Sequence, residues 1–163
     1  DGKQYAEDIR KDIDNISTQR TQGHLAIALA LLNDQNSIPT IRELVRKRGD
    51  IGRRTTAAIA LGMLRDREAI SLLEDVMDKS SNSKAILGSA TVAMGHIGDR
   101  SAVPILSKIL KNRKDNQDVT RAFATVALGY LGDKDDIPLL SKIHEHCNYM
   151  APTESLSEIL TIL

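Results

Sequence analysis

Apolar residues return every three or four positions in several segments of the chain, the spacing of one face of an α-helix. The clearest runs are Tyr5, Ile9, Ile13 and Ile16, then Ile38, Ile41, Leu44 and Val45, then Ile137, Leu140 and Ile143. The positions between them are mostly polar, so each run predicts an amphipathic helix that buries one face. The pattern favours an all-α fold in which helices pack on helices.

One motif occurs four times, and each copy ends on an aspartate. The copies are Ala28–Asp34, Ala60–Asp66, Ala93–Asp99 and Ala127–Asp133. Five residues after each aspartate stands Pro39, Ser71, Pro104 or Pro138, always preceded by an isoleucine or a valine. The four aspartates are 32, 33 and 34 residues apart. Self-similarity at a period of this length indicates stacked two-helix units.

Each copy has a physical explanation. A small residue lies inside the first helix of the unit, where a neighbouring helix must come close: Ala30, Gly62, Gly95 or Gly129. Glycine inside a helix costs about 1 kcal/mol relative to alanine, so a tight contact is expected at these positions, Gly129 included. Gly98 and Gly132 can end the helix in the left-handed conformation, whereas Arg65 fits that conformation poorly. The aspartate is expected to accept backbone N–H groups in the turn, and proline suits the first turn of the second helix.

These signals predict a single repeat domain over residues 1–163, with about ten helices. An orphan helix at 3–17 would be the second helix of a preceding unit. The expected pairs lie at about 20–48, 53–80, 85–113 and 117–147, and a partial unit lies at 153–163. Because the chain opens without a Met and stops inside an apolar helical pattern, it is expected to be a fragment of a longer protein.

The fourth copy carries the repeat pattern most fully, in Arg121, Ala124, Ala127, Leu128, Gly129, Leu131, Gly132, Asp133, Pro138 and Leu140. This pattern resembles the short HEAT repeats of phycobilin-lyase-like proteins, the PBS lyase HEAT-like type. The third and first copies depart from it at the arginine position, where they have Leu87 and Gln22. The second copy keeps Arg54 there but lacks the turn glycine and the proline. The resemblance covers about residues 22–163 and implies a right-handed α-α superhelix, a solenoid of the HEAT-like and armadillo type. It implies little about function, since such repeats serve many unrelated proteins.

Composition narrows the functional classes. Lys and Arg together number 22, and Asp and Glu also number 22, which argues against a protein that binds nucleic acid through net charge. No apolar run reaches the length of a membrane span, so no membrane insertion is expected. The single cysteine, Cys147, leaves the compartment open, and of the compartments we favour the cytoplasm.

Enzymes built on this scaffold provide tests for chemistry. HEAT-repeat iron hydroxylases place His-Glu early in the first helix, where this chain has Gly23-His24, Thr55-Thr56, Gly88-Ser89 and Ala122-Phe123. HEAT-like DNA glycosylases need aromatic residues in a basic groove, and this chain has four scattered aromatic residues. His144 and Cys147 share a helix face, but two ligands do not make a structural zinc site. His96 takes a packing position of the repeat. We therefore predict no catalytic, cofactor-binding or metal-binding residue.

The second helices of the units carry a charged ridge, at offsets three, four and seven from the proline position. Its residues are Arg42, Glu43, Arg46, Glu74, Asp75, Asp78, Ser107, Lys108, Lys111, Ser141, Lys142 and Glu145. Two interpretations stay open. The charges either pair across neighbouring helices, Arg42 and Arg46 with Glu74 and Asp78, and Asp75 and Asp78 with Lys108 and Lys111, or form a template for a partner.

A separate basic patch, Arg46-Lys47-Arg48 with Arg53-Arg54, flanks the junction of the first two units. It could bind phosphate or an acidic peptide, or serve only solubility. The function predicted from these features is a protein-interaction module whose partner is another protein or peptide. The alternative is a lyase-like enzyme or enzyme subunit of the phycobilin-lyase HEAT type. The oligomeric state stays open.

Overall fold

The computed structural model describes residues 2–111 and 118–132, and the structural statements below concern these residues. Eight α-helices and two short 3-10 helices make up the regular secondary structure of this part. The α-helices are α1 (Gly2–Asp12), α2 (Gln19–Leu31), α3 (Ile38–Arg46), α4 (Ile51–Met63), α5 (Ala69–Lys79), α6 (Lys84–Ile97), α7 (Val103–Lys111) and α8 (Asp118–Gly132). The 3-10 helices are η1 (Gln35–Ser37) and η2 (Arg100–Ala102). The all-α prediction is confirmed.

The eight helices fall where the repeat pattern placed the first eight of ten. Helix α1 lies in the orphan segment, and α2 to α7 form three pairs, one in each of the first three predicted units. Helix α8 is the first helix of the fourth unit. The two remaining predicted helices, in the later part of 117–147 and in 153–163, lie outside the described residues.

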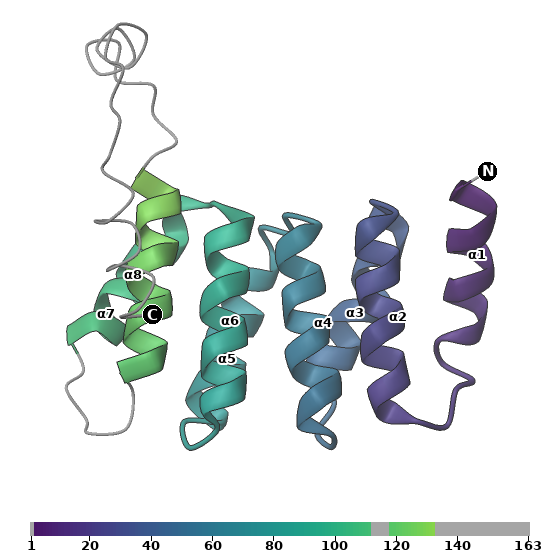
Figure 1. Cartoon of the computed structure of the whole chain (residues 1–163), viewed down its shortest axis with the longest axis horizontal. Helices are drawn as coiled ribbons and strands as arrows, with labels where there is room; N and C mark the ends of the chain where they lie inside the picture. The colour runs from purple at the N-terminus through teal and green to yellow at the C-terminus, as the bar shows by residue number, and fades with distance from the viewer. Residues whose placement is uncertain (1, 112–117, 133–163) are drawn as a thin grey trace, which may run out of the picture. The chain divides into compact units, whose positions relative to one another are not determined.

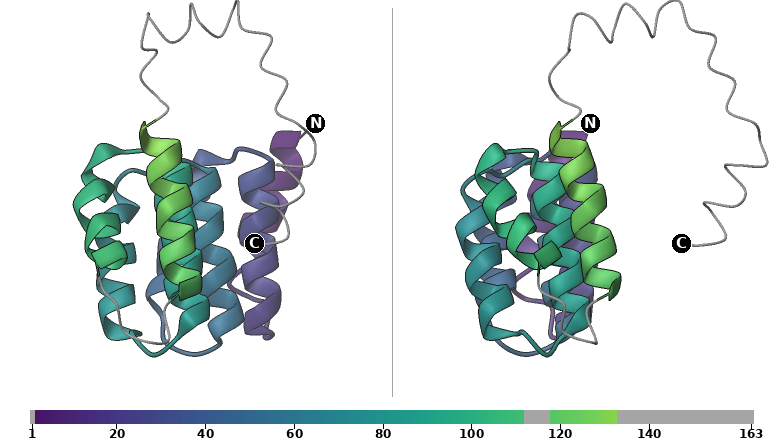
Figure 2. Two further views of the ribbon diagram at one scale, coloured as in Figure 1. Left: turned by 60° about the vertical axis from the view of Figure 1, so that its left-hand side comes forward. Right: turned by 90° about the vertical axis from the view of Figure 1, so that its left-hand side faces the viewer.

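The paired helices form two layers. Helices α2, α4, α6 and α8 stand side by side in one row, and α3, α5 and α7 lie behind them (Figure 1). The views along the row show the same two layers (Figure 2). Each helix of the first row packs mainly on the next one of that row, so the contacts that join the units are between sequence neighbours.

Aliphatic and small side chains fill the space between the layers. The second helices contribute residues at i, i+3 and i+4, as in Ile41, Leu44 and Val45 of α3, which are at most 1% exposed. The first helices are richer in alanine, and α6 buries Ala90, Ala93 and Met94 among ten buried residues. Small residues let neighbouring helices approach closely. This explains how a chain with four aromatic residues still has a close-packed core.

Two of the tight helix contacts occur at the repeat positions Gly62 and Gly95. A Cβ built on Gly62 would lie 2.8 Å from Ala93 Cα, and one on Gly95 would lie 2.9 Å from Ala127 Cβ. At Gly129 the expected contact is not found, because no described atom lies within 4 Å of a Cβ placed there. The reason is geometric: each of these glycines faces the first helix of the following unit, and α8 is the last such helix described.

The turns between the two helices of a unit differ partly from the prediction. Asn33, Arg65 and Gly98 have positive φ values of 52°, 54° and 69°, so Arg65 takes the left-handed conformation in spite of its poor fit. Its N–H donates to Gly62 O at 3.0 Å, which closes the last turn of α4. Of the aspartates that follow, Asp99 accepts the N–H of Ser101 with its carboxylate at 2.9 Å, as expected. The carboxylate of Asp66 instead accepts hydrogen bonds from the side chain of Arg42, in the preceding unit.

Candidate interaction surface

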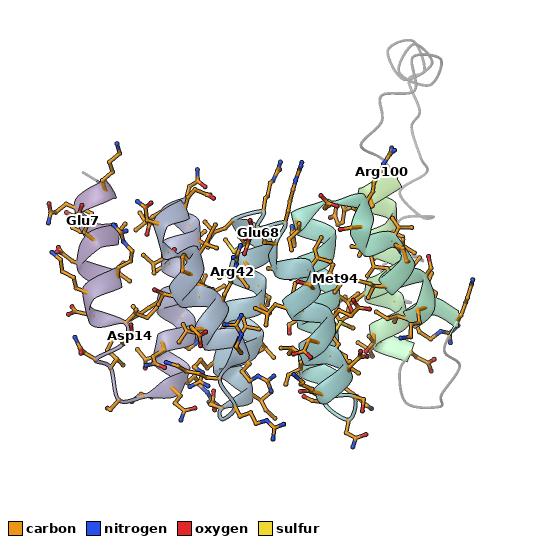
Figure 3. The ribbon with its side chains drawn as sticks, turned by 180° about the vertical axis from the view of Figure 1, so that it is seen from behind. Glu7, Asp14, Arg42, Glu68, Met94 and Arg100 are labelled. Carbon is orange, nitrogen blue, oxygen red and sulfur yellow. The ribbon has the colours of Figure 1, made fainter. Side chains whose placement is uncertain are left out.

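The charged ridge of the second helices lies on the layer formed by α3, α5 and α7, on positions that the buried residues of these helices leave free. Figure 3 views the molecule from the side of this layer. Arg46, Asp75, Asp78, Lys108 and Lys111 are exposed. The half-buried residues of the ridge are Arg42, Glu43, Glu74 and Ser107. The remaining residues, Ser141, Lys142 and Glu145, lie outside the described part of the chain.

The side chain of Arg42 contributes to the contact between two units more than to the exposed part of the ridge. Its Nε donates to Asp66 Oδ2 at 2.6 Å, and its Nη2 to Asp66 Oδ1 at 2.5 Å. Its Nη1 lies 2.9 Å from Glu68 Oε2, and both residues are labelled in Figure 3, near the upper middle of the view. The hydrogen bond to Asp66 raises the pKa of Arg42 above its ordinary value, against a smaller opposing effect of burial. The guanidinium therefore stays charged and fixed at the α3–α4–α5 junction.

The same kind of arginine–aspartate ion pair recurs one unit earlier. Arg10, which follows α1's Ile9 as Arg42 follows Ile41, lies 3.2 Å from Asp34. Both pairs join an arginine of a second helix to the turn aspartate of the following unit. At the next junction Asp99 pairs with Arg67, at 3.5 Å between Arg67 Nε and Asp99 Oδ2. The change has a local reason, because α5 carries Glu74 at the position where α3 carries Arg42.

The ion pairs between neighbouring helices, which one of the two interpretations of the ridge requires, are not found among the described residues. Arg46 pairs with Glu43 of its own helix, and Lys79 Nζ lies 2.7 Å from Asp75 Oδ2, also within one helix. Lys108 and Lys111 make no described ion pair. Residues three or four apart on one helix meet more readily than residues on neighbouring helices, so the ridge charges pair locally or face solvent.

A shallow cavity of about 120 Å³ lies between α5 and α7 and brings together three ridge residues, Glu74, Asp78 and Lys108. Its other lining residues are Met77, Ser81, Leu87, Ile105 and Ile109. The apolar part was not predicted, because Ile105 and Ile109 follow the ordinary core spacing of α7. A site that combines two carboxylates with the half-buried aliphatic side chains of Ile105 and Ile109 suits a partner side chain with a positive end and an apolar stem.

A second, larger cavity of about 360 Å³ lies at the ends of α3 and α5, beside α4. Its lining residues are Arg46, Arg48, Arg54, Asp75, Val76, Lys79 and Ser80. Three of these belong to the basic patch predicted from the sequence, and Lys79 and Ser80 join them through the fold. We refer to this cavity as the basic cavity.

The residues tested for metal or catalytic chemistry are mostly surface or packing residues. The described residues hold no group of three or more His, Cys, Asp or Glu side chains that could bind a metal ion. His96 is exposed and stacks on Tyr130 of α8, with ring centroids 6.1 Å apart. His144 and Cys147 lie outside the described residues. None of the helices described here is both long and apolar enough to cross a membrane.

Comparison with known families identifies the repeats. Residues 14–90 match the family of HEAT repeats, and residues 86–112 match the PBS lyase HEAT-like repeat. No curated protein is similar enough to the chain to count as a match. The two family matches follow one another along the chain and span α2 to α7, which are the helix pairs seen in the structure. The chain therefore belongs to the HEAT-repeat proteins, and its residues 86–112 form a repeat of the PBS lyase HEAT-like type.

Proposed function

We propose that this chain is a protein-interaction module that binds a protein or peptide partner along α3, α5 and α7. HEAT repeats are generally scaffolds for protein interaction, and this layer carries the charged ridge and both cavities. The observation that carries the proposal is the α5–α7 cavity, where Glu74 and Asp78 flank the apolar side chains Met77 and Ile105. Charge gives a binding surface its register and its rate of association, while burial of apolar groups supplies affinity.

The charges along the layer suggest how a partner would be oriented. The basic cavity, at the ends of α3 and α5, is lined mostly by cations, and the α5–α7 cavity carries Glu74 and Asp78 beside Lys108. An extended peptide with an acidic group at one end and a basic, partly apolar residue further along would match both sites in one direction only. Reversing such a peptide would place like charges together, which costs several kcal/mol.

The lyase-like alternative draws only on the PBS lyase HEAT-like match to residues 86–112. No feature of the described surface favours it, so it is not proposed here as the function.

The test compares two variants with the same change of net charge. Glu74, Asp75 and Asp78 are changed to Lys in the ridge variant, and Glu7, Asp8 and Asp12 are changed to Lys in the control variant, where all three are exposed on α1. Peptides selected from a displayed library with the full chain are then titrated against all three proteins by fluorescence anisotropy. We expect the ridge variant to bind at least about tenfold more weakly and the control variant to bind like the wild type.

Two outcomes contradict this proposal. If every selected peptide binds the ridge variant and the wild type equally, the layer is not the binding surface. If both variants lose binding to the same extent, net charge and not the α5–α7 cavity determines affinity. Circular dichroism melts of the two variants show whether either has lost its fold.

A further inference from the structure

The basic cavity contains an arginine without a carboxylate partner, Arg54. Its Nε donates to Val45 O at 3.0 Å and its Nη1 to Ser80 Oγ at 3.4 Å, so both acceptors are neutral. Arg121 occupies the same position of the repeat in α8, and its Nη1 lies 3.2 Å from Asp118. Three residues before Arg54 the chain has Ile51 in place of that aspartate. Arg54 therefore lacks the acidic neighbour that its counterpart has.

The surroundings of Arg54 add positive charge. Arg53 is 4% exposed, and its guanidinium donates to Gln19 Oε1, Lys47 O and Arg48 O, all uncharged acceptors. Arg48 is exposed and makes no described ion pair. Burial, followed by repulsion from Arg53 and Arg48, lowers the pKa of Arg54 below its ordinary value. A buried or half-buried cation in a folded protein normally faces an anion, and here the described residues supply none for Arg53 and Arg54.

The negative groups at the cavity do not balance this charge. Asp75 is the one acidic residue of the lining, and it is held by Lys79 at 2.7 Å. The carboxyl-terminal ends of α3 and α5 lie at the cavity and contribute partial negative charge, about half an elementary charge for a helix end. Arg54 already satisfies one of these carbonyls, Val45 O, with its Nε. The Nη2 donors of Arg54 and the whole guanidinium of Arg48 make no described hydrogen bond.

We propose that the basic cavity is a binding site for a phosphoryl group, held by Arg48 and Arg54 with Arg46, Lys79 and the Ser80 hydroxyl around it. A phosphoryl group carries nearly two negative charges and three acceptor oxygens, so it can bridge two guanidinium groups that approach from α4 and from the loop before it. A carboxylate has one charge and two oxygens, and it would leave one of the arginines without an ionic partner. The volume of about 360 Å³ is large enough for the phosphoryl group with the side chain or ion that carries it.

This inference rests in part on the proposed function, because the basic cavity shares Arg46 and Asp75 with the ridge, but it adds the chemical class of the bound group and does not require a protein partner. The phosphoryl group could come from free phosphate or from a phosphorylated side chain of a partner. The test separates these two sources, and it uses no ridge peptide, so its result is independent of the test of the ridge.

The experiment follows ¹⁵N–¹H spectra of the full chain during titration with three probes. The probes are inorganic phosphate, N-acetyl-phosphoserine amide and N-acetyl-glutamate amide. We expect saturable shifts for Lys47–Arg54 and for Lys79 and Ser80 with at least one of the two phosphoryl probes, and none of comparable size with the glutamate probe. Saturation by inorganic phosphate means that the free ion suffices, whereas saturation by phosphoserine alone assigns the site to a phosphorylated partner.

Matched variants locate the site. Arg48→Gln removes an exposed guanidinium that makes no described hydrogen bond, and Arg54→Gln removes the half-buried one. Arg67→Gln is the control, since it makes the same change in the turn at the opposite end of α5. We expect Arg48→Gln and Arg54→Gln each to weaken phosphoryl binding about tenfold or more, and Arg67→Gln to leave it unchanged.

Three results would overturn the proposal. The first is the absence of saturable shifts with both phosphoryl probes. The second is equal binding of the glutamate probe. The third is unchanged phosphoryl binding in Arg48→Gln, a variant whose fold should be intact because its side chain holds no described contact.

Discussion

At the scale of single residues, the turn aspartates act through their carboxylates on the preceding unit. Asp66 is 6% exposed and is held by two hydrogen bonds from Arg42, whereas the sequence predicted a purely local role in its own turn. This contact could not be predicted from spacing alone, because Arg42 and Asp66 meet only once two units have packed. The burial of Asp66 makes the pair more important than the exposed ion pairs of the ridge.

A double-mutant cycle measures this difference. The variants Arg42→Gln, Asp66→Asn and their combination should give a coupling energy of about 1–3 kcal/mol in urea denaturation. Arg42→Gln leaves the buried Asp66 carboxylate without its cation, and Asp66→Asn leaves Arg42 with the exposed Glu68 as its anionic partner. The matched cycle on Lys79→Gln and Asp75→Asn should give at most about 0.5 kcal/mol, since both side chains are more than half exposed. Equal coupling energies in the two cycles would show that the Arg42–Asp66 pair is no more than a surface contact.

At the scale of helices, the repeat pattern predicted which elements form and how they pair, because apolar spacing and turn residues are local signals. It also predicted the close contacts of the first helices at Gly62 and Gly95. It placed one such contact at Gly129, where the described structure has no neighbour. The basic patch was visible as a run of charges, but its shape as a cavity depends on Lys79 and Ser80, which reach it only through the packing of α5.

Substitution of the contact glycines tests the packing of the first helices. Gly62→Val and Gly95→Val should each lower the free energy of unfolding by about 1–3 kcal/mol, because the added atoms overlap Ala93 and Ala127 on the next helix. Ala85→Val is the control: Ala85 is exposed on α6, so only helix propensity changes, by less than about 1 kcal/mol. Losses no larger than that of the control would mean that α4, α6 and α8 are spaced more widely than described.

At the scale of the whole described part, stability depends on contacts between neighbouring units. Helix α1 has a neighbour on one side and buries Ala6 alone within its bounds, whereas α6 lies between α4 and α8 and buries ten residues. In an array of this kind, a terminal element can separate without loss of the rest, but an internal one cannot.

Hydrogen–deuterium exchange followed by mass spectrometry should show this gradient. We expect peptides from α4 and α6 to exchange most slowly and peptides from α1 to exchange faster, because opening α1 breaks the fewest apolar contacts. Protection of α1 equal to that of α6 would indicate that the described part opens as one cooperative unit.

The Arg42–Asp66 pair also has a consequence for how such a gene can change in length. The segment 35–66 contains both members of the pair, and Arg10 and Asp34 both lie before it. A deletion of this segment by unequal recombination would remove Arg42 together with its partner Asp66, and it would leave the earlier pair, Arg10 and Asp34, in place. Ancestral gain or loss of such a unit would therefore leave neither member of this kind of pair without the other.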